Sequence, residues 1–151
     1  MIENAPLKRK RFKTPVAVHL LLIHDGQVLL LQRANTGYED GNYSLIAGHL
    51  DGGEPIKDAM IREASEEAGI EITPDDLEVV GVMHQIDPLE EYIDFFLVAR
   101  RWRGEIDNRE PHKCSALAWY SLDRLPPNVI PYVRQALVNY QRGVWFDSFG
   151  W

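Results

Sequence analysis

Apolar residues along this chain gather in short runs of strand length, separated by polar segments rich in glycine, proline and aspartate. The run over 16–23 is almost wholly apolar, which is typical of a strand buried on both faces. Asp25-Gly26 follows it as a hairpin signal, and the chain then returns through a second apolar run. The pattern predicts strands at residues 16–23, 28–33, 43–47, 77–85, 92–101 and 117–121.

Two segments carry helical signals instead. Pro55 suits the first turn of a helix that runs to about residue 68, and Gly69 is the residue expected just past its end. A closing helix over 132–142 has one apolar side, formed by Val133, Ala136, Leu137 and Tyr140. Strands mixed with two helices predict the α+β class, with loops at 35–42, 48–54 and 104–115.

The composition fits one globular domain. Of the 151 residues, 45% are hydrophobic and 26% are charged, values that exclude wholesale disorder. Five of the sixteen basic residues lie within the first fourteen positions, so we expect a basic tail over 1–13 followed by a single domain over 14–151. The net charge is −7, and a body this acidic should repel a nucleic-acid backbone unless metal ions intervene.

Cysteine content and hydropathy indicate in which cellular compartment the protein is expected. The single cysteine, Cys114, rules out an internal disulfide framework and any site built from several cysteines. No apolar run approaches the roughly 20 residues of a spanning helix, and the basic N-terminus lacks an apolar signal region. We therefore expect a cytoplasmic protein that does not associate with membranes.

The first predicted helix carries the informative charges. Glu63, Glu66 and Glu67 span an arc of roughly 100°, beside the apolar stripe of the helix. Like charges at these spacings each cost roughly 0.2–0.5 kcal/mol when solvated, so a favourable partner is expected. Arg62 offsets part of the repulsion between the glutamates. A divalent cation would offset the rest, because Mg²⁺ prefers carboxylate oxygens. A charged, solvated helix face is the simpler alternative for three glutamates taken alone.

The surrounding residues narrow this choice. Residues 48–70 read GHLDGGEPIKDAMIREASEEAGI, with Glu54 six positions after Gly48 and seven residues between Glu54 and Arg62. A chance match to such a spacing is on the order of one in ten million in a chain of this length. The segment resembles the Nudix box, the signature of the Nudix hydrolase family, at every specified position.

The resemblance implies an α/β/α sandwich with a mixed sheet, and cleavage of a phosphoanhydride in a nucleoside diphosphate linked to another group. It also implies Mg²⁺ or Mn²⁺ as the cofactor. It assigns Glu63, Glu66 and Glu67 as metal ligands, any of which could be the general base, and adds the Ala47 carbonyl as a further ligand. It assigns Arg62 to orienting Glu66 or Glu54, while Gly48, Glu54 and Gly69 shape the box. Ile46-Ala47-Gly48 departs from the commoner Pro-Gly-Gly of the family.

A second pattern lies in the late loop, where Glu110 precedes Pro111 and Lys113. It resembles the nucleoside triphosphate diphosphatases of the family, in which an acid on this loop reaches the metals. Glu110 is then a further metal ligand, and Lys113 faces the phosphates. Arg33 ends a strand beside the cleft and resembles a phosphate-contacting arginine, and His49 is a further candidate for substrate binding.

The preferred interpretation is hydrolysis of a nucleoside triphosphate to the monophosphate and pyrophosphate. ADP-ribose and nucleotide sugars remain alternative substrates. A non-catalytic nucleotide- or RNA-binding module, with the basic tail as its arm, is a further alternative, although nucleic acid is not the expected partner. The aromatic C-terminus, with Trp145, Phe146, Phe149 and Trp151, is expected to dock onto the domain or onto a second copy in a homodimer.

Overall fold

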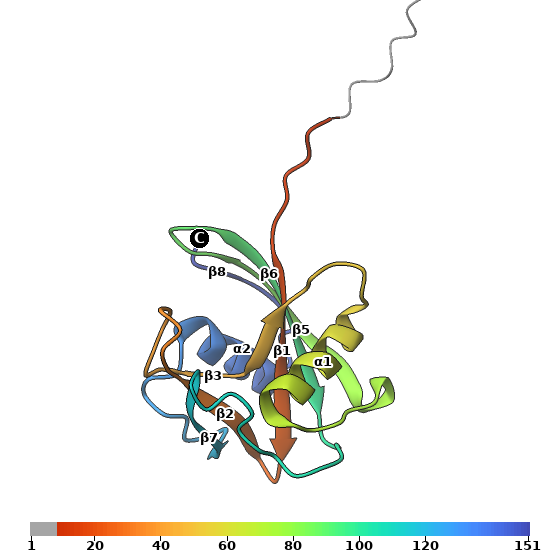
Figure 1. The fold of residues 1–151 in the computed structure, drawn as a ribbon. Coiled ribbons are helices and arrows are strands. Elements are labelled where there is room, and N and C mark those ends of the chain that lie inside the picture. Colours follow the sequence, from red (N-terminus) through yellow and green to blue (C-terminus); the bar gives the residue numbers. More distant parts are fainter. Residues whose placement is uncertain (1–8) are drawn as a thin grey trace, which may run out of the picture.

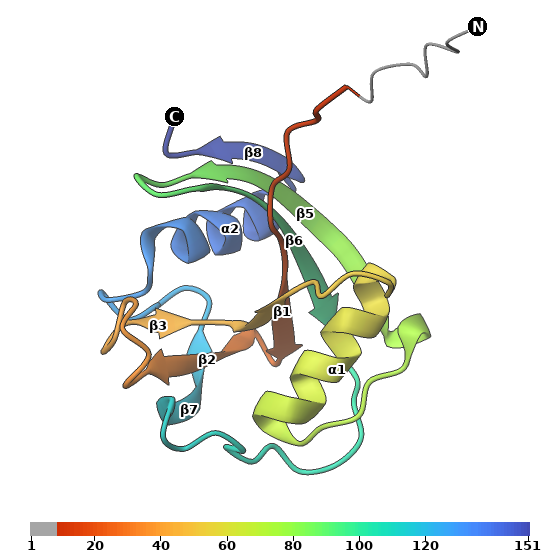
Figure 2. The ribbon, with the colours of Figure 1, turned by 45° about the horizontal axis from the view of Figure 1, so that its top comes forward.

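The computed structural model describes residues 9–151, so most of the predicted tail over 1–13 lies outside the described residues. Figures 1 and 2 show a curved sheet with one helix on each side. The strands are β1 (Val16–His24), β2 (Gln27–Arg33), β3 (Tyr43–Ser44), β4 (Ile46–His49), β5 (Leu77–Ile86), β6 (Glu91–Ala99), β7 (Cys114–Ser121) and β8 (Phe146–Phe149). The helices are α1 (Ile56–Ala68), the 3₁₀ turn η1 (Pro74–Asp76) and α2 (Pro131–Arg142).

Strand β1 organises the sheet because it changes partner along its length. Its first half pairs antiparallel with β4, in the register Val18↔Gly48, and its end pairs antiparallel with β2, in the register Ile23↔Val28. Its other edge runs parallel to β6. The sheet is therefore mixed, with the order β3-β2-β1-β6-β5-β8, and β4 and β2 diverge from the same edge of β1.

Two hydrophobic clusters fill the spaces on either side of this sheet. Alternate residues of β1 point to opposite faces, so Val18, Leu20 and Leu22 join the cluster that includes the buried residues of α1. Leu21 points the other way, into the cluster that includes Val133 and the rest of the buried face of α2. The arrangement is the α/β/α sandwich that the sequence predicts.

Three of the differences between the structure and the sequence prediction concern the site and the edges of the sheet. Gly48 and His49 were expected in a loop but belong to β4, because their backbone pairs with β1. Strand β7 begins at Cys114, earlier than the expected residue 117, and pairs with β2. The aromatic C-terminus docks onto the domain as expected, and does so as the parallel strand β8 beside β5.

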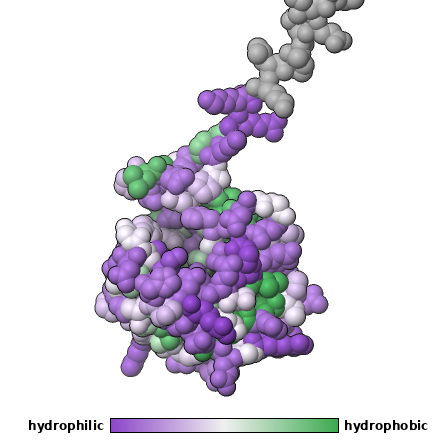
Figure 3. Space-filling model, viewed as in Figure 1, coloured by the Kyte–Doolittle hydropathy of each residue, from purple (hydrophilic) through white to green (hydrophobic). Residues whose placement is uncertain are grey.

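Figure 3 shows a mostly hydrophilic surface on the face seen in Figure 1, with a few small apolar patches. Within residues 9–151, no helix is both long and apolar enough to cross a membrane.

Candidate active site

The buried face of α1 consists of small residues and one methionine, which lets the helix approach β4 and β1 closely. Ala59, Met60, Ala64 and Ala68 are fully buried in this contact. Glu63 and Glu67 each precede one of these alanines and lie one turn apart. Their carboxylates are therefore held at the border between α1 and the sheet.

The carboxylate of Glu63 lies directly over Gly48 in β4. A Cβ atom added at Gly48 would come within 2.1 Å of the Glu63 carboxylate and would displace it. Gly48 therefore allows the Glu63 carboxylate to lie where it does over β4.

Arg62 clamps two carboxylates from one guanidinium group. Its Nη2 and Nε atoms donate to the two oxygens of Glu54, at 2.7 and 3.3 Å, and Nη1 donates to Glu63 at 2.9 Å. Glu66 lies farther from Nη1, at 3.6 Å, and its side chain is 52% exposed. The hydrogen bonds from Arg62 lower the pKa of Glu54 below its usual range. Arg62 thus fixes the position of Glu63 more firmly than that of Glu66.

Glu67 reaches from α1 to the backbone of β4, where the Ala47 N–H donates to its carboxylate at 3.1 Å. In an antiparallel pair the N–H and C=O of one residue point to the same side. The Ala47 carbonyl therefore faces the same edge of β4 as Glu67. The pKa of Glu67 is raised to about 8, first by burial and then by the charges of Glu63 and Glu110, while the Ala47 hydrogen bond opposes the shift.

The pKa of Glu63 is also raised, first by burial and then by the charges of Glu66 and Glu110, while Arg62 opposes the shift. Two neighbouring carboxylates with raised pKa values form a site that favours positive charge.

The loop before β7 brings Glu110 to this site by hydrogen bonding to the end of α1. The backbone N–H groups of Asp107 and Arg109 donate to the free carbonyls of Ala68 and Glu67, at 3.0 and 3.1 Å. The Arg109 side chain also lies over Gly69, where a Cβ would meet it at 2.6 Å. These contacts cap the helix, and they explain how a residue 40 positions after the box joins it.

Five of the residues singled out from the sequence line one cavity of about 390 Å³: Arg33, Ala47, Glu67, Glu110 and Lys113. Arg33 is held at the end of β2, where its Nε donates to the Tyr38 carbonyl at 2.8 Å and its guanidinium lies 5.3 Å from the Tyr38 ring centroid. The cavity thus has two carboxylates and two basic side chains in its lining.

A second cavity, of about 400 Å³, adjoins the first and shares Arg33 and Ala47 with it. We call it the aromatic cavity, because three tyrosines line it, Tyr38, Tyr92 and Tyr132, and His49 stacks on Tyr92 at 6.2 Å. Its lining includes four buried polar residues that the sequence did not assign: His19, Ser44, Gln85 and Asp94. The floor of the cavity is formed by His19, Gln85 and Asp94. The available signal was the presence of polar residues inside strands that are otherwise apolar.

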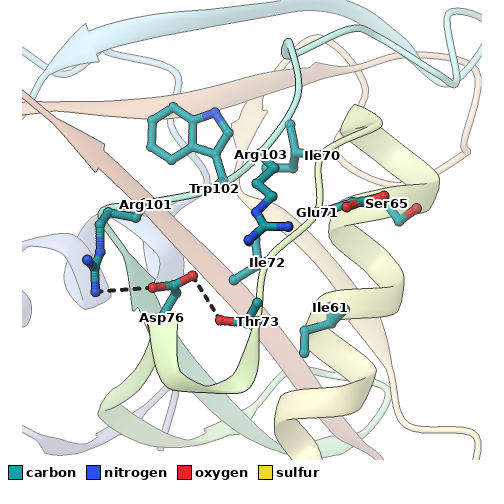
Figure 4. Close-up of a pocket in the computed structure, with 10 residues that line it drawn as sticks. All are labelled: Ile61, Ser65, Ile70, Glu71, Ile72, Thr73, Asp76, Arg101, Trp102 and Arg103. Carbon is teal, nitrogen blue, oxygen red and sulfur yellow. Dashed lines mark hydrogen bonds and ion pairs between the residues drawn. The ribbon is translucent and has the colours of Figure 1, made fainter.

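A further hollow lies apart from both cavities, between the exposed side of α1 and the residues after β6. Figure 4 shows its lining, in which Asp76 binds Arg101 at 3.3 Å and accepts a hydrogen bond from Thr73 at 2.9 Å. Its volume is about 610 Å³, but it contains none of the residues singled out from the sequence.

Not all the predicted metal ligands meet. Glu66 is exposed, and within residues 9–151 no three acidic, histidine or cysteine side chains converge closely enough to hold a cation as they stand. The aromatic residues Tyr43 and Trp119 pack against Tyr120 and Trp102.

Comparison with known proteins identifies the arrangement. The family model described as NUDIX domain matches residues 13–139. The chain is 33% identical over 108 residues to the NAD-capped RNA hydrolase NudC of Pseudomonas aeruginosa strain LESB58, a match that covers 72% of this chain and 37% of that protein. It is 30% identical over 124 residues to the human 8-oxo-dGDP phosphatase NUDT18, covering 81% of this chain and 36% of that protein.

The chain therefore spans less than two-fifths of the length of these two relatives. Among solved structures, the MutT NUDIX hydrolase from Burkholderia pseudomallei superimposes with a TM-score of 0.77 at 30% identity. That match covers 84% of this chain and 98% of the other.

Proposed function

This chain belongs to the NUDIX domain family, and we propose that it is a metal-dependent hydrolase that cleaves a phosphoanhydride in a nucleotide. The observation that carries the proposal is the first cavity, which Glu67 and Glu110 line together with Arg33 and Lys113. A polyanionic pyrophosphate link requires both positive side chains for its oxygens and a means of activating water beside them.

The residues fit a divalent cation in their chemistry. Carboxylates of Glu63, Glu67 and Glu110 and the Ala47 carbonyl are hard oxygen donors of the kind that Mg²⁺ and Mn²⁺ prefer. The pKa values of Glu63 and Glu67 are raised mainly by burial, so a cation bound beside them would stabilise their charged forms. Glu66, one turn from Arg62, would join them by rotation of an exposed side chain. A bound cation neutralises phosphate charge and lowers the pKa of a water molecule.

The other side chains position the reactants. Arg62 holds Glu63 over Gly48, so the carboxylate is oriented before substrate arrives. Arg33 and Lys113 contact the phosphates, Arg33 from a guanidinium already fixed by Tyr38 and Thr36. One of the site glutamates accepts the proton of the attacking water.

The favoured substrate is a nucleoside triphosphate, cleaved to the monophosphate and pyrophosphate. The late-loop residues Glu110 and Lys113 support this, because both line the cavity that holds Glu67. The adjoining aromatic cavity has room for a nucleoside, and it meets the first cavity at Arg33 and Ala47. ADP-ribose and nucleotide sugars are the alternative substrates for the same bond cleavage.

A substrate screen tests the proposal. Purified protein is incubated with ordinary and oxidised nucleoside triphosphates, NAD, ADP-ribose and nucleotide sugars, each with Mg²⁺, with Mn²⁺ or with a chelator. The expected result is metal-dependent release of a nucleoside monophosphate from at least one of these compounds. Release of inorganic phosphate alone, or cleavage that persists in the chelator, would contradict the proposal.

A capped RNA is a second candidate substrate. The relative in Pseudomonas aeruginosa is named a NAD-capped RNA hydrolase, and residues 9–13 of this chain expose four basic side chains: Arg9, Lys10, Arg11 and Lys13. If the tail binds RNA, cleavage of NAD-capped RNA should exceed cleavage of free NAD, and the excess should vanish in high salt or after removal of residues 1–13. Equal rates on both substrates would leave the free nucleotide as the substrate.

A further inference from the structure

The floor of the aromatic cavity is a chain of three buried polar side chains from three adjacent strands. His19 of β1 contacts Asp94 of β6 through Nε2 and Oδ1 at 2.9 Å, and Gln85 of β5 donates to the other carboxylate oxygen at 2.8 Å. Their exposed fractions are 3%, 2% and 8%, in the order His19, Asp94 and Gln85. The three side chains form a continuous polar strip beneath the cavity.

One polar atom of this strip lacks a hydrogen-bond partner. Among residues 9–151, His19 Nδ1 is the buried side-chain nitrogen or oxygen that has no hydrogen-bond partner. The imidazole ring is fixed by stacking on Phe96, at 4.8 Å, and by edge contact with Tyr132, at 5.7 Å. An unpaired buried polar atom costs free energy. His19 is one of the residues that line the cavity, so a ligand group that enters the cavity and displaces the wall around Nδ1 would supply the missing partner.

The hydrogen-bond chain also sets which kind of partner is accepted. The Asp94 carboxylate is an acceptor, so the ring nitrogen that faces it, Nε2, carries the proton. In the neutral ring Nδ1 then has a free lone pair and can only accept a hydrogen bond. Gln85 strengthens the arrangement because its amide occupies the second oxygen of Asp94.

We propose that His19, oriented by Asp94 and Gln85, selects a nucleobase that carries an amino group, which donates to Nδ1. The inference rests on the proposed function and deepens it, since the same cavity opens beside Ala47 and Arg33. The walls suit a base because Tyr38, Tyr92 and Tyr132 offer aromatic surfaces. A base that lacks the amino group leaves Nδ1 unpaired and is bound less tightly.

Substrate pairs that differ only in that amino group test the assignment. The pairs are ATP against purine riboside triphosphate, and GTP against ITP. In the wild-type protein, at least one pair should show a preference of about tenfold or more in kcat/KM for the amino-bearing member, mainly through KM.

The variant Asp94→Asn then reverses the tautomer with almost no change in volume. The new amide accepts from Gln85 through its oxygen and donates through its nitrogen to His19 Nε2, which moves the ring proton to Nδ1. The preference for the amino group should fall at least about tenfold. If this variant does not fold, His19→Phe provides the second test, because it keeps the stacking on Phe96 and should bring the ratio towards one.

The pair His84 and Glu91 supplies a matched control. His84 of β5 contacts Glu91 of β6 through Nε2 and Oε2 at 3.0 Å, the same kind of histidine–carboxylate contact. Neither residue lines the cavity. Glu91→Gln should leave the substrate ratio unchanged. The assignment is overturned if no pair shows a preference, or if Asp94→Asn and His19→Phe both leave the preference as it is in the wild type.

A binding measurement separates this inference from the proposed function. Calorimetric titration with AMP against purine riboside monophosphate, and with GMP against IMP, reports the same amino-group preference without turnover. If no triphosphate is cleaved yet the monophosphates are discriminated and Asp94→Asn abolishes that discrimination, the hydrolase proposal fails and the role of His19 stands. If triphosphates are cleaved with no preference for the amino-bearing base, the proposed role of His19 is overturned and the hydrolase proposal stands.

Discussion

The carboxylate of Glu63 occupies the space that a side chain at Gly48 would need. A methyl group at position 48 would push Glu63 away from the position in which Arg62 holds it. The displaced group is the end of a flexible side chain, so the fold should accommodate the change better than the chemistry does.

We therefore expect Gly48→Ala to lower turnover by about a hundredfold, while the thermal midpoint changes little. Steady-state kinetics and thermal unfolding measure the two effects. Gly81→Ala is the control, because a Cβ at Gly81 in β5 meets its nearest neighbours at an ordinary 3.7 Å. A Gly48→Ala protein with wild-type turnover would show that the position of Glu63 is unimportant.

Glu67 should make the metal-free protein less stable as the pH rises. Its folded pKa of about 8 lies above the ordinary value of 4.5, so the fold favours the protonated carboxyl. The cost is absent below about pH 4.5, grows as the pH rises and is complete above about pH 8. At about 1.4 kcal/mol per unit of pKa, Glu67→Gln should gain roughly 2–4 kcal/mol over the wild type at pH 8 and almost nothing at pH 4.

Denaturant unfolding in a chelator at several pH values measures this gain. Glu105→Gln is the control, because Glu105 is exposed. A stability difference between Glu67→Gln and the wild type that does not change with pH would show that Glu67 is not held in a buried, uncompensated state.

Arg62 should matter for turnover more than for stability. Its side chain is 30% exposed, so its ion pairs are expected to stabilise the fold by only about 1 kcal/mol. Arg62→Lys replaces a planar fork with a single ammonium, which cannot bind both oxygens of Glu54 and also hold Glu63. We expect turnover to fall about tenfold in Arg62→Lys. If lysine supports full turnover, the two-carboxylate clamp has no catalytic role.

Glu110→Gln should raise the Mg²⁺ concentration needed for half-maximal activity several-fold, with an unchanged metal-free thermal midpoint. Glu110 lines the cavity with Glu67, and its charge contributes to the raised pKa of Glu67. Metal titrations of activity measure the effect. Asp107→Asn on the same loop is the control, since that side chain is 68% exposed and is paired with Arg109. An identical Mg²⁺ requirement in Glu110→Gln and the wild type would remove Glu110 from the metal site.

The box and the helix that carries it were predictable because they depend on residues close together in the sequence. Pro55 and Gly69 mark the ends of α1, and the spacing of Glu63 and Glu67 places both on one border of it. The placement of Glu110 was inferred only from a resemblance. Its physical cause is the hydrogen bonding of Asp107 and Arg109 to the end of the helix, which no local pattern reveals.

The polar floor of the aromatic cavity could not be predicted for the same reason. His19 and Asp94 are 75 positions apart, and they meet because β1 and β6 run parallel in one register. Strand β8 was also missed as a strand, since four residues with two exposed aromatic neighbours, Trp145 and Trp151, carry no clear strand pattern. Its conformation depends on pairing with β5.

The central claim is that the carboxylates beside Ala47 support metal-dependent cleavage of a nucleotide phosphoanhydride. The most direct test is the Mg²⁺-dependent rate of nucleoside monophosphate release, compared between the wild type, Glu67→Gln and the Glu105→Gln control on the best substrate of the screen. We expect Glu67→Gln to fold and to lose activity by several orders of magnitude, on the scale of about 3–5 kcal/mol, with the control unaffected. A Glu67→Gln protein that releases the monophosphate at the wild-type rate with the same Mg²⁺ requirement would contradict the claim.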